Sequence, residues 1–472
     1  MTGPRPGRAA PRRPRTVVVG GGLAGIAAAL RLADHGHRVT LVERAPVLGG
    51  LCRSVTDPVA GRVDTGQHVF LGCCTALERF LRRIGAAPAV RQRRLELVIA
   101  TPGGPRTVRT QPLPSPLHLA AALGRWPGLS TADRARAAAL GVHTAALDDD
   151  TLARLDDVPC LGWLQGHGQS LGACTWLWDP ILVASCNVPL ARCSAGLAAF
   201  VIREGLMRGS GWAALRIPAT DLSAWLDPPA RAALQAAGVA IHRRWRATAV
   251  EAAADGGLVL RGGPAGAGDG ALAAEAVVLA VPARAARRLL PPALREEAVL
   301  TAAAHLPDSP IVNGHLFCDR PILPGTVVVA PASPLQWCFD RTALDRPGAG
   351  VPRGRPELFH VAISLSAADG WAQVPEQEVA ARLWSACQDV YPAARRARLL
   401  HHRVTREAHA TFAAGPGSGR ARPGPATGHP GIALAGSWTA TGWPATMEGA
   451  VRSGEAAART VVAGRLGADT GL

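Results

Sequence analysis

A glycine-rich turn near the start of the chain has the spacing G-x-G-x-x-G and follows the apolar run at residues 16–19. In a strand–turn–helix unit, Gly20 would permit the tight turn, Gly22 would let a pyrophosphate approach the backbone, and Gly25 would let helix and strand pack closely. Glu43 follows at close to the usual ~20 residues, where an acid accepts hydrogen bonds from ribose hydroxyls. The spacing therefore predicts a dinucleotide site.

The flanking residues supply the elements that this motif needs. Apolar residues at Ile26, Ala29, Leu30 and Ala33 follow helical periodicity, and Gly36 is typical of a helix end. A second strand is expected over residues 38–42. The helix N-terminus would present free N–H groups, including those of Leu23 and Ala24, to the phosphates of the ligand.

A second glycine pair, Gly49-Gly50, follows Glu43-Arg44 and is itself followed by Arg53. This order resembles the E-x-GG-R element of the flavin amine oxidase and phytoene desaturase superfamily. The resemblance implies that the dinucleotide is FAD, that both glycines lie close to it, and that Arg53 reaches its phosphates. Arg44 would lie beside the adenosine end.

The C-terminal region supplies a second half of the same site. A buried strand is predicted over residues 432–436, and a helix should begin near Thr446, a plausible N-cap, with Met447 on its apolar face and Glu448 in its first turn. In the superfamily this helix points its N-terminus at the flavin, where it stabilises negative charge on the reduced ring. Relatives usually read Ala-Gly-Asp-Trp before it, whereas this chain has Gly436-Ser437. The single hydroxyl of Ser437 would weaken FAD binding by about 1 kcal/mol.

Motifs spread over nearly the whole chain resemble one family within that superfamily, the squalene-associated FAD-dependent desaturases or hydroxysqualene dehydroxylases of hopanoid pathways. The matching segments are residues 64–68 with Gly66 and Gln67, 178–187, 217–222, 336–341 and 436–454. The resemblance implies reduction of hydroxysqualene to squalene with loss of water. It also implies reduced FAD as hydride source and an apolar pocket for the long isoprenoid.

Loss of hydroxide from an allylic alcohol requires a general acid. Three residues in the matching segments could supply the proton: His68, Asp179 and Glu448. His68 is the first choice because its segment follows the FAD-binding part. Each residue also has a structural interpretation. His68 could be a histidine bonded to backbone, Asp179 a helix cap before Pro180, and Glu448 a residue that positions the flavin.

Large and polar side chains in the same segments are candidates for the substrate pocket. Tryptophan faces could favour transient positive charge on the substrate, and an asparagine could position it, although core packing or a turn explains each residue equally well. These candidates are Trp178, Asn187, Trp337, Trp438 and Trp443.

The composition excludes several kinds of chemistry. The chain of 472 residues has no lysine, so its 51 basic residues are all arginine and its formal net charge is +16. Schiff-base and Walker lysines are thereby excluded. The positive charge suits an anionic membrane face, or reflects composition bias alone, and no motif supports nucleic acid binding. Ten cysteines without a C-x-x-C pair are expected to be buried thiols rather than disulfides or metal ligands.

The predicted fold class is α/β: a Rossmann-like FAD-binding domain, discontinuous in sequence, with a second α+β substrate domain. The FAD-binding domain should comprise residues 16–74, 216–292 and 430–472, and the substrate domain residues 75–215 and 293–429. Residues 1–15 are expected to form a disordered basic tail. No stretch is apolar and long enough for a transmembrane helix.

Two other functions remain open from the sequence. A carotenoid- or phytoene-type desaturase or isomerase would share the fold and cofactor, and a non-catalytic prenyl-binding protein would share the fold. An amine oxidase is disfavoured because the chain has a single tyrosine and no lysine. The electron donor that reduces FAD is not evident from the sequence. We expect a cytoplasmic protein, soluble or peripheral on the inner face of the cytoplasmic membrane.

Overall fold

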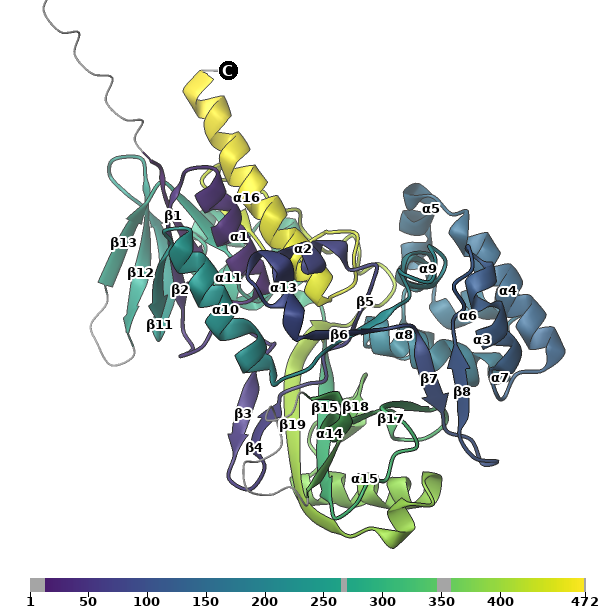
Figure 1. Cartoon of the computed structure of the whole chain (residues 1–472). Coiled ribbons are helices and arrows are strands. Elements are labelled where there is room, and N and C mark those ends of the chain that lie inside the picture. The colour runs from purple at the N-terminus through teal and green to yellow at the C-terminus, as the bar shows by residue number, and fades with distance from the viewer. Residues whose placement is uncertain (1–12, 265–269, 346–357, 471–472) are drawn as a thin grey trace, which may run out of the picture.

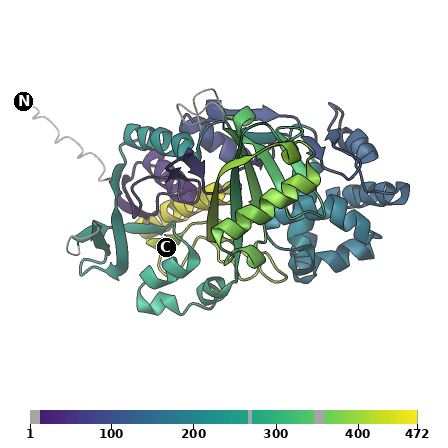
Figure 2. The same cartoon turned by 90° about the horizontal axis from the view of Figure 1, so that it is seen from below.

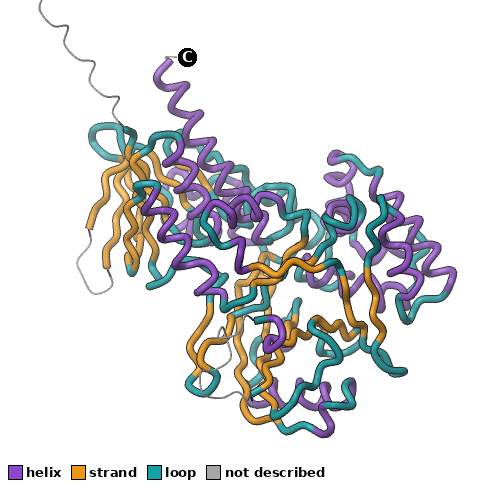
Figure 3. The backbone as a smooth tube through the Cα atoms, viewed as in Figure 1, coloured by secondary structure: helices purple, strands orange, loops and turns teal. Residues whose placement is uncertain are grey.

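The computed structural model describes residues 13–264, 270–345 and 358–470. Figure 1 shows three parts: a sheet-and-helix unit that contains both described ends of the chain, a large sheet flanked by one long helix, and a lobe of helices at the opposite side. The tube in Figure 3 shows helices and strands together in the first part, a prominent sheet in the second and mainly helices in the third.

A five-stranded parallel sheet forms the centre of the first unit. Its order is β10 (Ala240–Arg243), β2 (Arg38–Glu43), β1 (Arg15–Val19), β14 (Ala276–Leu279) and β20 (Ile432–Leu434). The strands come from the three sequence ranges predicted for the FAD-binding domain. Because they are parallel, their carboxyl ends meet at one edge, where open α/β sheets bind ligands.

Three helices pack beside this sheet: α1 (Leu23–Asp34), α10 (Leu222–Ala236) and α16 (Met447–Thr470). The first ends where Gly36 adopts a left-handed φ of 78°, as the sequence predicts. Helix α16 lies very close to α1 at Gly454: a Cβ on this residue would stand 2.1 Å from the carbonyl oxygen of Ala24. Only glycine permits this contact.

A three-stranded antiparallel sheet contacts β1, β2 and β14. It consists of β11 (Trp245–Ala252), β12 (Leu258–Pro264) and β13 (Gly270–Ala274). Arg244, with a φ of 58°, separates β10 from β11.

The large sheet has seven strands, and α15 (Glu376–Val390) crosses one face of it (Figure 2). The strand order is β19 (Leu399–Phe412), β15 (Asp308–Cys318), β18 (Phe359–Leu365), β17 (Gln336–Asp340), β16 (Val327–Ala330), β7 (Glu96–Ile99) and β8 (Arg106–Arg109). All seven strands lie within the ranges predicted for the substrate domain. Alternating apolar residues of β15 and β18 pack against α15 in a core separate from that of the parallel sheet.

The helical lobe follows β8 in the chain and ends at Leu206. It contains α3 (Ala120–Arg125), α4 (Thr131–Ala145), α5 (Asp149–Arg154), α6 (Cys160–Gly166), α7 (Leu171–Ala173), α8 (Asp179–Cys186) and α9 (Ala195–Val201). Two of its helices contain π-helical turns, η4 (Cys174–Trp178) and η6 (Ile202–Leu206). Such turns are rare and often occur at functional sites.

Short elements join the three parts. They are β3 (Ser54–Asp57), β4 (Gly61–Asp64), β5 (Phe70–Leu71), α2 (Thr75–Arg83), β6 (Val90–Arg93), β9 (Leu215–Pro218), α11 (Ala283–Leu289), α12 (Pro292–Arg295), α13 (Ala298–His305) and α14 (Arg341–Leu344). Strand β9 pairs with both β5 and β6, so it ties the chain leaving the helical lobe to the segment that follows the FAD-binding motifs.

Three expectations from composition can be compared with this fold. The ten cysteines are all buried free thiols, as predicted. No helix within the described ranges is long and apolar enough to cross a membrane. The basic tail expected at residues 1–15 falls mostly outside the described residues, and Arg15 already belongs to β1.

Candidate functional site

One large cavity lies between the parallel sheet, the seven-stranded sheet and the helical lobe. Its volume is about 1960 Å³, whereas sites for a single small ligand usually measure about 300–1,000 Å³. The lining residues come from the Gly20–Ala24 turn at one end and from α8, α9 and η6 at the other. The cavity can therefore hold a dinucleotide and a second long molecule.

The turn after β1 has the geometry that the glycine motif predicts. Gly20 has a φ of 107°, and a Cβ on Gly25 would stand 1.8 Å from the carbonyl oxygen of Gly20. A Cβ on Gly22 would meet nothing nearer than Gly50 Cα at 3.8 Å, since this residue faces the cavity. Gly20 and Gly25 thus build the turn, and Gly22 leaves its surface open to a ligand.

The acid of the motif, Glu43, lies at the end of β2 and lines the cavity. Its Oε2 accepts a hydrogen bond from the backbone N–H of Gly21 at 2.6 Å, and its Oε1 accepts one from Ala45 at 2.7 Å. Each carboxylate oxygen has a further lone pair for a ribose hydroxyl. The exposed side chain of Arg44 lines the same end of the cavity.

The second glycine pair lies directly against the first turn. Gly49 forms a parallel bridge with Gly22, and both glycines of the pair have positive φ angles, 116° and 63°. A Cβ on Gly50 would stand 3.0 Å from Gly22 Cα, so this wall of the cavity is bare backbone. Arg53 also lines the cavity, and its guanidinium lies 3.4 Å from the Glu407 carboxylate.

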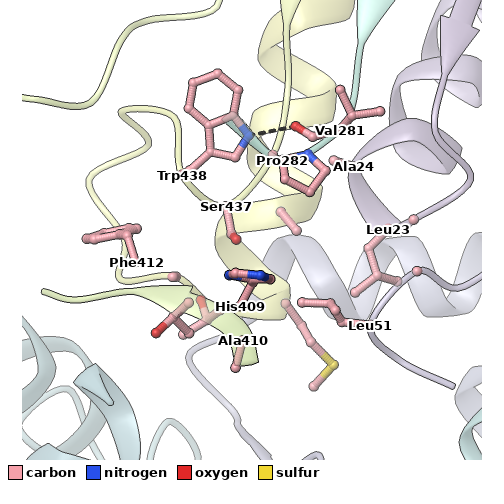
Figure 4. Close-up of a pocket in the computed structure, with 18 of the residues that line it drawn as sticks. Leu23, Ala24, Leu51, Val281, Pro282, His409, Ala410, Phe412, Ser437 and Trp438 are labelled. Atoms are coloured by element: carbon pink, nitrogen blue, oxygen red, sulfur yellow. Dashed lines mark hydrogen bonds between the residues drawn. The ribbon is translucent and has the colours of Figure 1, made fainter. Parts of the chain in front are cut away.

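The C-terminal segment closes the other side of the dinucleotide end. Gly436 has a φ of 142°, and Ser437 points into the cavity (Figure 4). Trp438 lies over it, with its Nε1 donating to the carbonyl of Val281 at 2.9 Å. Thr446 caps α16 as predicted, because its hydroxyl accepts a hydrogen bond from Gly449 N–H. Met447, the first residue of α16, also lines the cavity.

Glu448 borders the cavity, but hydrogen bonds to another helix occupy its carboxylate. This carboxylate is fully buried and accepts hydrogen bonds from the N–H groups of Ala76 at 3.1 Å and Leu77 at 2.7 Å. Arg452 donates a third at 2.7 Å. Glu448 therefore caps the N-terminus of α2 from α16. This accords with a positioning role and leaves the predicted proton donation without structural support.

His68 lines the cavity, and its ring folds back over its own segment. Its Nδ1 lies 3.1 Å from the carbonyl oxygen of Gly66, to which it donates. Burial alone would lower the pKa of His68, but the Cys52 side chain and the Gly66 carbonyl together raise it above its ordinary value. Gln67 lies beside it on the wall, 3.5 Å from the guanidinium of Arg341.

Three predicted site residues do not line the cavity. Asp179 is exposed in the first turn of α8. Trp178 is buried, with its Nε1 donating to Gln169, and the Nε1 of Trp337 donates to the carbonyl of Pro180 at 3.0 Å. The two tryptophans thus pack around α8 as part of the core, and the structure corrects their predicted placement in the pocket.

The remaining pocket candidates do line the cavity. Asn187 ends α8 with a φ of 56°, and its side chain bonds Ser309, Thr411 and the backbone of Ala367. This network ties the helical lobe to β15 and β19. Trp443 makes an edge-to-face contact with Phe200 of α9 at 5.1 Å between ring centroids. The aromatic pair forms part of the wall away from the Gly20 turn.

Several cavity residues were not predicted from the sequence. Phe412, Ala410 and His409 of β19 line the cavity opposite Leu51 and Ser437 (Figure 4). Glu204 of η6 also borders it, where Arg203 and Arg208 neutralise its carboxylate. Nothing local in the sequence marks these positions, because their neighbours in space are distant in the chain.

These residues fit FAD. The bare backbone between Gly22 and Gly50 gives a diphosphate close access, the N-terminus of α1 presents N–H groups beside it, and Glu43, at the end of the neighbouring strand β2, lines the same cavity. The N-terminus of α16 borders the same cavity. Within the described residues no cluster of side chains could hold a metal ion.

Comparisons with known proteins agree with this geometry. Residues 23–462 match the model of the family described as flavin containing amine oxidoreductase. The hydroxysqualene dehydroxylase of Rhodopseudomonas palustris is 33% identical over 94% of this chain and 98% of its own length. A zeta-carotene desaturase of Zea mays is 26% identical, covering 93% and 82% of the two chains.

Solved structures show the same fold. An oxidoreductase from Methanosarcina mazei superposes with a TM-score of 0.71 at 19% identity, over 93% of this chain and 98% of the other. The predicted α/β FAD-binding fold is thereby confirmed. The chain belongs to the flavin-containing amine oxidoreductase family and, within it, to the group of the hydroxysqualene dehydroxylases, as an FAD-dependent oxidoreductase.

Proposed function

We propose that the protein reduces hydroxysqualene to squalene, with reduced FAD as the hydride source. The main support is the similarity to hydroxysqualene dehydroxylases over nearly the full length of both chains. The cavity agrees with this reaction, because beyond the dinucleotide end it continues between α8, α9 and β19, where a long apolar chain would be accommodated.

The chemistry imposes three requirements on the cavity. The C–O bond of the allylic alcohol breaks and water leaves, which requires a proton on the hydroxyl. The carbon then gains a hydride, so that R–OH, H⁺ and H⁻ give R–H and H₂O. Reduced FAD supplies the hydride when bound. The residues of this chain must hold the isoprenoid, deliver the proton and keep other nucleophiles away from the carbon.

Apolar and aromatic side chains meet the first and third requirements. Phe200, Val201 and Trp443 form a continuous stretch of wall. Aromatic faces also favour transient positive charge on the reacting carbon. The second requirement is a proton donor, and His68 and His409 are two side chains of the cavity wall that could supply the proton.

The alternative reaction is oxidation of a carotenoid-type substrate, since zeta-carotene desaturases are also similar to this chain. Desaturation would remove hydride from the substrate and reduce FAD. The two reactions thus differ in the direction of electron flow, which a flavin spectrum follows directly.

The experiment uses the purified holoenzyme, chemically reduced and kept anaerobic, with hydroxysqualene in detergent micelles. We expect the oxidised flavin spectrum to return as squalene forms, one-to-one. Flavin that stays reduced with unchanged substrate would contradict the proposal. Reduction of oxidised holoenzyme by a carotenoid precursor, with a desaturated product, would establish the alternative.

We also propose that the enzyme works at the cytoplasmic face of an anionic membrane, where an insoluble C30 substrate resides, with a separate electron donor that reduces FAD. The net charge of +16 supports electrostatic attraction to such a surface. Co-sedimentation with vesicles of anionic lipid, lost in high salt and absent with neutral lipid, would support this location. Equal binding to both vesicle types would contradict it.

A further inference from the structure

His409 belongs to a cluster of three charged or titratable side chains on three different elements. Its Nδ1 lies 2.7 Å from Oδ2 of Asp308 at the start of β15. Because a carboxylate has no proton to give, Nδ1 donates. Arg284 of α11 places its guanidinium 2.8 Å from the same oxygen and also donates to the carbonyl of Ala304. The imidazole is therefore held through one nitrogen.

A β-bulge brings His409 to this position. In the pairing of β15 with β19, Ser309 lies opposite Thr411, but the next pair joins Ile311 to Glu407, so that β19 has additional residues at this point. A bulge re-aims a side chain away from its regular alternation and is common beside active sites. Within this bulge, His409 and Ala410 line the cavity.

The imidazole lies where the two units of the fold meet. Figure 4 shows its ring inside the cavity, between Ser437 of the FAD-binding unit and Ala410 of β19, with Leu51 across from it. The side chain is 65% exposed, so water reaches it. No described residue forms a hydrogen bond with its Nε2, which leaves this nitrogen for a ligand.

His68, the other histidine considered above, is less available. Its Nδ1 is engaged with Gly66, and the Cys52 side chain is its second hydrogen-bonding neighbour. Asp308 has no counterpart beside His68, whose partners are a backbone carbonyl and a thiol. His409 has both a carboxylate that orients it and an unengaged nitrogen.

We propose that His409 is the general acid of the reaction, with Asp308 and Arg284 as positioning residues. The inference rests on the proposed function. Nε2–H of the imidazolium protonates the substrate hydroxyl as the C–O bond breaks, the hydride replaces it, and water leaves. Solvent returns the proton to His409. Asp308 fixes the tautomer and ring orientation, and Arg284 fixes Asp308.

Other charged and titratable groups border this part of the cavity. Glu407 lies on the same strand and pairs with Arg53, and His305 of α13 has its Nδ1 2.7 Å from the carbonyl of Thr301. Since these groups also titrate or carry charge, a pH profile is informative only as a comparison between wild type and a variant at His409.

The test compares His409→Gln with wild type in the anaerobic single turnover described above. We expect the variant to keep its FAD content and flavin spectrum while flavin reoxidation by hydroxysqualene slows at least ~100-fold, within the range for loss of a general acid. The rate should depend on pH in the wild type, whose step uses a proton from the side chain, and the variant should lack that dependence. His402→Gln, on the same strand but outside the cavity, is the matched control.

Asp308 provides the second arm. Asp308→Asn should slow the same step, and Asp308→Glu should restore part of the rate, because a carboxylate again reaches Nδ1. If His409→Gln stays within threefold of wild type while His68→Gln loses the step, His409 is not the acid. If His409→Gln loses FAD, the residue is a cofactor ligand and the inference is also wrong. A wild-type enzyme that leaves hydroxysqualene unchanged would contradict the proposed function itself.

Discussion

At the scale of single residues, the second and third glycines of the dinucleotide motif, Gly22 and Gly25, have different roles. Gly25 faces inward, against the carbonyl of Gly20, and Gly22 faces the cavity. The spacing of the motif predicts these two roles, and the structure supplies the contacts behind them: Gly25 builds the turn, and Gly22 leaves its surface open to a ligand.

This difference predicts opposite phenotypes. Gly22→Val should fold normally but be purified without flavin, because its side chain fills the space that a diphosphate needs; its φ of −76° suits any residue. Gly25→Ala should lower the free energy of unfolding by about 2–3 kcal/mol or more, since overpacking at 1.8 Å forces the backbone apart. Flavin absorbance and urea denaturation measure the two effects.

The control is Gly162→Val in α6, where an added Cβ meets nothing within 4 Å and lies outside the cavity. It should retain both flavin and most of its stability. Normal flavin content in Gly22→Val would disprove the assignment of this turn to the diphosphate.

At the scale of elements, Glu448 connects two helices that both border the cavity. It lies in the first turn of α16 and caps α2, whose own N-cap residue, Cys74, makes no side-chain cap. The carboxylate satisfies two N–H groups that a buried helix start would otherwise leave unpaired. The N-terminus of α16 is thereby fixed relative to the segment that carries His68.

Glu448→Gln should therefore act mainly on stability. We expect the free energy of unfolding to fall by about 1–3 kcal/mol. The amide of glutamine keeps one oxygen acceptor, but its NH₂ group would face the N–H donors of α2 or of Arg452. Thermal and urea unfolding of the holoenzyme would measure it. Glu455→Gln, on the same helix, is the matched control. A 100-fold loss of turnover at unchanged stability would instead show that Glu448 acts in the chemistry.

At the scale of the whole molecule, a buried polar network joins the FAD-binding unit to the seven-stranded sheet. Asp64 accepts hydrogen bonds from Leu222 N–H and the Ser54 hydroxyl, and its backbone carbonyl lies 2.9 Å from His315 of β15. Burial raises the pKa of Asp64 to about 6, although Arg341 opposes this rise. Burial likewise raises the pKa of Asp345 to about 7.

These shifts predict how stability depends on pH. A carboxyl group whose pKa rises on folding stabilises the folded state at pH values below its ordinary pKa of 3.8. This contribution is lost as the pH rises through the folded pKa of about 6. Between pH 4 and pH 7, the free energy of unfolding of the wild type should therefore fall by about 2–3 kcal/mol relative to that of Asp64→Asn. The asparagine keeps the acceptor for Leu222. Denaturant titrations at several pH values measure the difference, and a constant difference would contradict the prediction.

The local part of this site could be predicted from the sequence. The turn at Gly20–Gly25, the glycine pair and the Thr446 cap depend on backbone dihedral angles or on contacts within a few residues, and Glu43 follows from the spacing of one strand–helix–strand unit. Three of the parallel strands, β1, β2 and β20, were likewise predictable from their apolar runs.

Which side chains meet could be seen only once the chain was folded. His409 and Asp308 are 101 residues apart, and Glu448 caps a helix start more than 370 residues away. Trp178 and Trp337 pack around α8, whereas Trp443 lines the cavity beside Phe200. Periodicity identifies a buried face but not its partner, since the partner is fixed by the close packing of elements from distant parts of the chain.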